Sequence, residues 1–291
     1  MWLVFAFGSA LFAGITSVLA KCGIKQTNST IATAIRTIIV LLFSWLMVFI
    51  VGSQGQISTL DVKTLIFLVL SGLTTGASWL CYFKALQIGQ THKVVSVDKS
   101  STVLTILMAF IFLHESMSIY SGVAVVLIAI GTFLMIDKDD MQKTESKGIG
   151  WFFYAFGSAV FASFSSILGK IGVFQIESNL GTAIRTSVVL LMSWLMVLIT
   201  KKQKELSHIP KKEFMFICLS GLATGCSWLC YYKALQDGLA SVVVPIDKLS
   251  ILVTVSFSYF VFHERLSRKS MIGLIAIVIG TAIMALSTLF G

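Results

Sequence analysis

Two adjacent charged residues occur twice in strongly apolar surroundings. Asp98 and Lys99 stand in the stretch VVSVDKSSTVLTIL, and Asp247 and Lys248 stand in VVPIDKLSILVTVS. A charge inside the hydrocarbon of a membrane is costly, so ionisable residues there are candidates for function. They offer ion pairing, contact with a charged substrate, or uptake of a proton, because removal from water favours the neutral form of a carboxyl group. These four residues are the first candidates for a substrate-binding or transport site.

Two arginines and four aromatic residues join them. Arg36 and Arg185 each lie one turn into an apolar run, and structural ion pairing is the alternative to a transport role. Neighbours on a helix point about 100° apart, so each aspartate needs a partner on another helix. The candidate pairs are Asp98 with Arg36 or Lys84, and Asp247 with Arg185 or Lys233. The aromatic candidates for a cavity wall, with an interfacial belt as the alternative, are Trp79, Tyr82, Trp228 and Tyr231.

The elements that position these residues must cross a membrane. The chain of 291 residues is 56% hydrophobic and 12% charged, with a mean hydropathy of +0.92, whereas soluble domains are about 25% charged. The net charge of +9 comes mainly from loops between apolar runs, so it indicates membrane orientation and not a nucleic-acid partner. Nucleophile–base pairs, metal-ligand spacings and phosphate loops are missing from the sequence, so we expect no enzyme, no cofactor and no metal.

The chain repeats itself at a distance of 149 residues. SGLTTGASWLCYFKALQIG in the first copy returns as SGLATGCSWLCYYKALQDG in the second. The predicted organisation is a first five-helix repeat at 1–137, a linker at 138–149 and a second repeat at 150–291. The small residues Gly72 and Gly76, with their copies, predict close helix packing.

Each copy holds five apolar runs of about 20 residues, the length of one membrane-spanning helix. We predict an all-α integral membrane protein with ten transmembrane helices. The spans are 2–20, 31–51, 64–83, 94–113, 117–136, 151–169, 180–200, 213–232, 243–262 and 267–289. Because five is odd, the second copy enters the membrane upside down, which makes the two copies inverted repeats, as in many secondary transporters.

Lys and Arg residues are distributed unequally between the two sides. Fifteen lie in loops on the side that the first helix reaches and three on the other, so the positive-inside rule places both termini outside. Each face is then predicted to carry a basic vestibule of four cations, one Asp and one Glu, which favours an anion or zwitterion. Glu115 and Glu264 are expected to stabilise helix N-termini.

The depth of the two aspartates suggests a mechanism. At 1.5 Å per residue, Asp98 and Asp247 fall about 7 Å below opposite membrane surfaces, so we expect them to lie apart, in two symmetry-related gates. Pro245 stands two residues before Asp247 and is expected to kink that helix, whereas the first copy has Ser96 there.

The order of several short motifs resembles the EamA family of the drug/metabolite transporter superfamily. These motifs are A-I-R early in the second helix, a small-residue third helix ending in A-L, and H-E-S or H-E-R before a fifth helix rich in I-G-T. The resemblance covers the whole chain and implies a ten-helix inverted-repeat carrier with a cavity lined mainly by helices 1, 3, 4, 6, 8 and 9. Members are usually described with cytoplasmic termini; we keep the opposite orientation given by the Lys and Arg count.

We therefore expect a secondary transporter of a small polar metabolite, anionic or zwitterionic and amino-acid-like, working by alternating access. A non-transporting membrane partner subunit or sensor is the alternative. Expected partners are a small-molecule substrate, the lipid bilayer and protons as a candidate coupling ion. The expected location is the plasma (inner) membrane of a prokaryote, with several passes and both termini outside.

Overall fold

The described part of the chain is entirely helical. The computed structural model describes residues 1–23, 26–88, 94, 97–116, 118–135, 150–262 and 267–289. The first half contributes α1 (Trp2–Gly23), α2 (Ser29–Val51), α3 (Val62–Ile88), α5 (Ser101–Phe112) and α6 (Ile119–Leu134). The second half contributes α7 (Gly150–Val173), α8 (Ser178–Ile199), α9 (Lys211–Asp237), α10 (Ala240–Lys248), α11 (Ser250–Phe262) and α12 (Arg268–Leu289). The short 3₁₀ helices η1 (Ser53–Thr59) and η2 (Gln203–His208) join α2 to α3 and α8 to α9.

Apolar sequence and local caps explain where these helices run. A backbone in hydrocarbon must satisfy its own hydrogen bonds, which a helix does. Asn28 caps α2 by accepting from the amide of Thr30 at 2.9 Å, and Glu177, its copy, caps α8 by accepting from the amide of Asn179 at 2.9 Å. Gly52 ends α2 with φ of 78°, a left-handed conformation that glycine adopts readily.

The predicted helices agree with the structure at most positions. Eight segments in the described residues are long and apolar enough to cross a membrane, and one of them, Ala240–Phe257, runs through α10 and α11. α6 is a shorter apolar helix. The predicted span 94–113 is described only in part, as helical residues 97–99 and α5. The predicted linker 138–149 lies outside the described residues. An all-α fold with many membrane-spanning helices is therefore confirmed, while the number ten stays a prediction.

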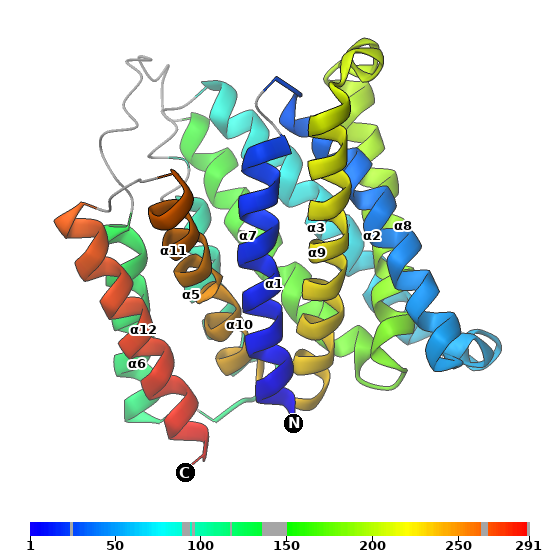
Figure 1. The fold of residues 1–291 in the computed structure, drawn as a ribbon. Coiled ribbons are helices and arrows are strands. Elements are labelled where there is room, and N and C mark those ends of the chain that lie inside the picture. Colours follow the sequence, from blue (N-terminus) through cyan, green and yellow to red (C-terminus); the bar gives the residue numbers. More distant parts are fainter. Residues whose placement is uncertain are drawn as a thin grey trace.

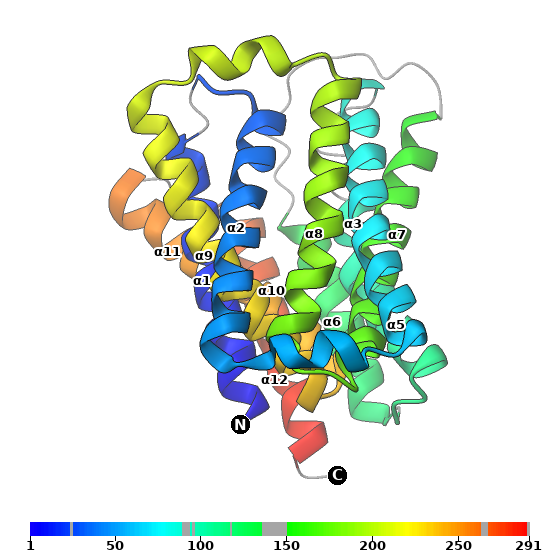
Figure 2. The same ribbon diagram turned by 90° about the vertical axis from the view of Figure 1, so that its right-hand side faces the viewer.

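The two halves of the sequence are interleaved in space. The closest helix neighbours are α3 with α7, α1 with α9, α6 with α12, and α2 with α8, and each pair joins one repeat to the other. Figure 1 shows α1 beside α9, and α6 beside α12 at one edge of the bundle. Both chain ends lie at the same end of the bundle in Figures 1 and 2. The space between the repeats is therefore lined by both of them.

Glycines allow two further close approaches between the repeats, α3 with α8 and α9 with α2, as the small-residue pattern predicts. A Cβ atom on Gly72 of α3 would lie 2.7 Å from Val188 Cβ of α8. A Cβ atom on Gly221 of α9, its copy, would lie 2.7 Å from Ile39 Cβ of α2. The prediction of close packing at these positions is confirmed, and it brings α8, with Arg185, against α3.

The fourth helix of each repeat is interrupted beside its Asp–Lys pair. Residues 97–99 are helical, Ser100 forms a turn and α5 follows; α10 ends at Lys248, Leu249 is a turn and α11 follows. Ser100 Oγ donates to the carbonyl oxygen of Val97 at 2.5 Å. Pro245 was expected to disturb only the second copy, but Ser100 interrupts the first copy as well, so a proline is not required for the break.

Candidate functional site

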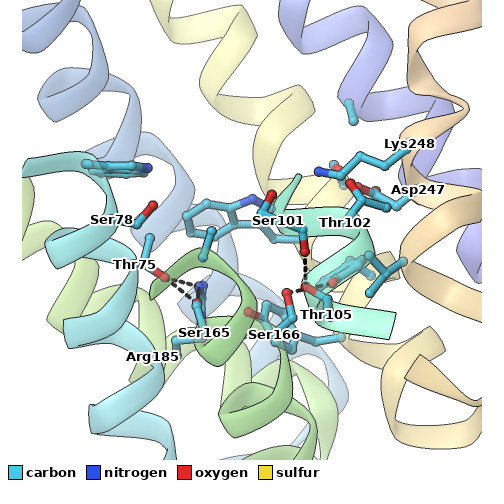
Figure 3. Close-up of a pocket in the computed structure, with 18 residues that line it drawn as sticks. Thr75, Ser78, Ser101, Thr102, Thr105, Ser165, Ser166, Arg185, Asp247 and Lys248 are labelled. Carbon is cyan, nitrogen blue, oxygen red and sulfur yellow. Dashed lines mark hydrogen bonds between the residues drawn. The ribbon is translucent and has the colours of Figure 1, made fainter. Parts of the chain in front are cut away.

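A cavity of about 260 Å³ lies between the two repeats. Its wall combines hydroxyl groups, aromatic rings and three charged side chains, as Figure 3 shows. The lining residues are Ala13, Thr75, Ser78, Trp79, Ser101, Thr102, Thr105, Ala162, Ser165, Ser166, Arg185, Ser227, Trp228, Tyr231, Tyr232, Val244, Asp247 and Lys248. Helices α1, α3, α5, α7, α8, α9 and α10 contribute them. A small site that is polar over half of its surface and holds a few charged groups is suited to a small polar molecule.

Arg185 of α8 is the most enclosed charge in this wall, at 4% exposed. Its Nε donates to Ser71 Oγ at 2.9 Å, and its Nη2 donates to Thr75 Oγ1 at 2.6 Å and to Ser165 Oγ at 3.0 Å. Figure 3 shows the bonds that hold Arg185 to Thr75 and Ser165. α3 and α7 pack closely and carry these hydroxyls, so the helix pairing positions the arginine.

Asp98 and Asp247 accept hydrogen bonds from serines of the opposite repeat. Ser158 Oγ donates to Asp98 at 2.6 Å, and Ser9 Oγ donates to Asp247 at 2.5 Å. The described contacts contradict the cation partners predicted for Asp247, because Lys233 pairs with Asp237 on its own helix at 3.2 Å and Arg185 bonds the hydroxyls above. Of the two candidates for Asp98, Arg36 bonds Thr33 instead, and the pairing with Lys84 stays a prediction. The reason is packing, because α7 lies against α5 and α1 against α10, which brings these serines within reach.

The two Asp–Lys pairs converge instead of lying apart. Asp98, Lys99 and Lys248 line one cavity of about 410 Å³, and Asp247 and Lys248 also line the central cavity. The prediction that they lie near opposite membrane surfaces is therefore wrong. α10 begins inside the protein, with every residue from 240 to 246 buried, and it ends at the pair, so the pair sits deeper than a count from the surface suggests.

Glu115 of the first repeat and Lys170 of the second form an ion pair beside the start of α10. Lys170 Nζ lies 3.1 Å from Glu115 Oε1 and donates to the carbonyl oxygen of Gly238 at 2.6 Å. Glu115 accepts from the amides of Ala240 at 2.7 Å and Ser241 at 2.9 Å. Glu115 thus stabilises a helix N-terminus as predicted, but that of α10 in the other repeat. Glu264, its copy, lies outside the described residues.

The aromatic and arginine candidates separate into two groups. Trp79, Trp228 and Tyr231 line the central cavity, and Tyr231 donates to Ser166 Oγ at 3.1 Å. Tyr82 packs instead on a cluster of Ala85, Val94 and Ala155, and it is not among the lining residues.

Arg36 and Lys99 also lie outside the central cavity lining. Arg36 Nη2 donates to Thr33 on its own helix at 3.4 Å, and Lys99 lines the neighbouring cavity. The structure therefore brings together Arg185, Asp247 and Lys248 with three of the four predicted rings.

Several site residues were missed by sequence reasoning. They are Ser9, Ser71, Thr75, Ser158, Ser165 and Tyr232. One signal was present for the aspartate partners, because AFGSA occurs once in each copy, at 6–10 and 155–159. A hydroxyl in an apolar helix commonly bonds its own backbone, so the pattern alone does not single out these serines.

Comparisons with known proteins agree with a duplicated membrane protein. The model of the EamA-like transporter family matches residues 1–137 and 149–286. An uncharacterized transporter in the cobO 3'region of Sinorhizobium sp is 40% identical over 135 residues, which is 46% of this chain and 96% of that protein. The uncharacterized protein MJ1333.1 of Methanocaldococcus jannaschii is 30% identical over 93 residues, 32% of this chain and 68% of that protein. A crystal structure at 15% identity has a TM-score of 0.77 over 98% of each chain and supports the fold alone.

Proposed function

Because the chain belongs to the EamA-like transporter family, we propose that it is a secondary transporter of small anionic or zwitterionic, amino-acid-like metabolites that works by alternating access. The observation that carries this proposal is the cavity between the two repeats. Its charged wall residues are Arg185, Asp247 and Lys248, which together carry a net charge of +1 and suit a carboxylate or a zwitterion. The full architecture in this proposal is ten membrane-spanning helices in two inverted repeats.

The Glu115–Lys170 ion pair between the two repeats supports alternating access. Glu115 and Lys170 hold the first turn of α10, and α10 carries Asp247 and Lys248 at its other end. Releasing Glu115 would free α10 to move and expose the cavity on that side. The copies of these residues are Lys21 and Glu264, so the repeat supplies the same pair of residue types for the opposite side.

Solute counterflow tests the proposal. Purified protein is reconstituted into liposomes that are loaded with unlabelled L-alanine, L-leucine, L-phenylalanine and L-glutamate, and uptake of each labelled amino acid is followed. We expect at least one to accumulate transiently above the level of protein-free liposomes. Lys202→Gln is the control, because this lysine pairs with Glu205 in the segment between α8 and α9 and is not among the residues that line the cavity.

Absence of counterflow for all four amino acids would contradict the amino-acid-like substrate. Binding of one of them without any flux would instead favour the partner-subunit or sensor alternative. The Lys202→Gln variant should match the wild-type rate, which shows that the measured flux does not depend on surface charge.

A further inference from the structure

The guanidinium group of Arg185 has hydrogen-bonding capacity that the described residues do not use. An arginine has five N–H donors. Nε and both N–H groups of Nη2 are engaged by Ser71, Thr75 and Ser165. Nη1 is buried and has no hydrogen-bond partner among the described residues. All the described hydrogen bonds of this cation go to neutral hydroxyls, so none of them compensates its charge.

Two aromatic rings of α9 complete the surroundings of this group. The guanidinium carbon lies 5.0 Å from the ring centroid of Trp228 and 4.8 Å from that of Tyr232. Ring faces stabilise a cation but accept no strong hydrogen bond from Nη1. An enclosed cationic nitrogen with two unpaired N–H groups is costly, and an anionic oxygen removes this cost. Arg185, Trp228 and Tyr232 all line the central cavity, so a molecule in the cavity can supply that oxygen.

The other copy of the arginine is built differently. Arg36 makes a 3.4 Å bond to Thr33 on its own helix and is not among the cavity-lining residues. The first repeat has Phe83 where the second has Tyr232, and Thr16 where the second has Ser165. The duplicated arginines therefore differ in their surroundings, and in the described part of the chain Arg185, but not Arg36, lines the central cavity.

We propose that Arg185 binds the carboxylate group of the transported molecule through Nη1, and that the second repeat alone supplies this contact. The inference rests on the proposed function and names the anionic group and its site. A carboxylate oxygen forms short, charge-assisted hydrogen bonds with a guanidinium group. A single anionic group fits better than a doubly charged one, since Asp247 and Lys248 cancel in the net charge of the wall. Because Nη1 is buried, the side chains around the guanidinium group must shift when the carboxylate arrives.

Tryptophan fluorescence of the full protein in lipid nanodiscs measures this binding. The probes are sodium acetate, glycine, L-alanine, L-leucine and L-phenylalanine, each paired with the amide that lacks the carboxylate, and inorganic phosphate as a different oxyanion. We expect saturable binding of at least one carboxylate, at least about 10-fold tighter than its amide. Arg185→Lys should weaken that binding at least about 10-fold, because lysine lacks the planar fork. Arg36→Lys, the matched control, should leave it within about 2-fold.

Three results would overturn the proposal: no carboxylate binds saturably, phosphate binds more tightly than every carboxylate, or Arg185→Lys binds as the wild type does. If Arg185→Lys does not fold, the proposal is tested by measuring carboxylate and amide affinities in Trp228→Phe and Tyr232→Phe. Each should change the affinity for the carboxylate at least about 3-fold without changing that for the amide, and unchanged affinities in both contradict the proposal. Counterflow at the wild-type rate in Arg185→Lys would contradict this inference and leave the transporter function standing. Carboxylate binding that depends on Arg185, without any flux in the wild type, would contradict the transporter function and leave this inference standing.

Discussion

Asp98 and Asp247 each hold a serine hydroxyl from the other repeat. Such a bond fixes the carboxylate and tethers two helices, α7 to the segment before α5 and α1 to α10. It also leaves the neighbouring lysines, Lys99 and Lys248, to face cavities. A hydroxyl donor stabilises an ionised carboxylate through a charge-assisted hydrogen bond. Both carboxylates therefore link the two repeats beside the cavities.

Replacing each aspartate by asparagine separates charge from shape. In Asp98→Asn and Asp247→Asn the amide oxygen can still accept from Ser158 or Ser9, so both variants should fold, with melting temperatures close to that of the wild type. If the charge serves transport, counterflow should fall at least about 10-fold. Asp237→Asn, whose partner is the exposed Lys233, is the control and should transport normally. Normal flux with normal pH dependence in both cavity variants would leave these carboxylates only a structural role.

The aromatic candidates make a set with an internal control. Trp79, Trp228 and Tyr231 line the cavity, so replacing each by leucine should weaken binding of the fluorescence or counterflow ligand about 5-fold or more, because ring surface at the site is lost. Tyr82→Leu should lower the melting temperature while affinity stays unchanged, since Tyr82 packs on Ala85, Val94 and Ala155. An equal loss of affinity in all four would place Tyr82 at the cavity in another conformation.

At the scale of helices, α10 is the element that connects the Glu115–Lys170 ion pair to the cavity. Glu115 and Lys170 hold its N-terminus, its residues from 240 to 246 are buried, and Asp247 and Lys248 stand at its C-terminal end. The break at Leu249 separates it from α11, so α10 is a half-length helix with separate contacts at its two ends. Discontinuous helices of this kind position binding groups near the middle of a membrane in other transporters.

Removing the charge of Glu115 should loosen this element. Glu115→Gln keeps the size of the side chain but weakens its bonds to Lys170 and to the amides of Ala240 and Ser241. We expect the free energy of unfolding to fall by about 2 kcal/mol, which is typical of losing hydrogen bonds to a charged group. This corresponds to a decrease of about 4 °C or more in melting temperature. Thermal unfolding in detergent micelles measures it.

The control for this change is Glu205→Gln. Its partner Lys202 is exposed, and exposed ion pairs contribute little, so the melting temperature should stay within about 1 °C of the wild type. A melting temperature for Glu115→Gln as high as that of the control would show that Glu115 does not hold α10 in place.

At the scale of the whole molecule, both chain ends lie at one end of the bundle, and the loop with η2 joins α8 and α9 at the other end (Figures 1 and 2). The unequal Lys and Arg distribution then predicts that both termini face away from the cytoplasm. Single cysteines placed in the loop at 201–206 and at the C-terminus of a cysteine-free variant can be labelled with an impermeant reagent in intact cells. We expect labelling at the C-terminus and protection of the loop. The reverse pattern would show the opposite orientation.

The helical architecture was accessible from sequence because it depends on local, repeated signals. Apolar runs of about 20 residues must form helices in a membrane whatever their neighbours are, and the shift of 149 residues needs no structure to be seen. Gly72 and Gly221 were predicted as packing positions from a local signal as well, because a residue without a side chain lets a neighbouring helix approach closely.

Which side chains contact each other inside the bundle depends on the tertiary structure and could not be read from the sequence. The repeats interleave, so Asp98 and Asp247 meet Ser158 and Ser9 rather than cations, and the helix breaks at Ser100 and Leu249 bring the charged pairs to shared cavities. The two arginines have the same local sequence, TAIRT, yet among the described contacts Arg185 bonds three hydroxyls, lies over two rings and lines the cavity, whereas Arg36 bonds Thr33 on its own helix. These differences come from residues on other helices, far away along the chain, and a sequence motif carries no information on which helix faces will meet.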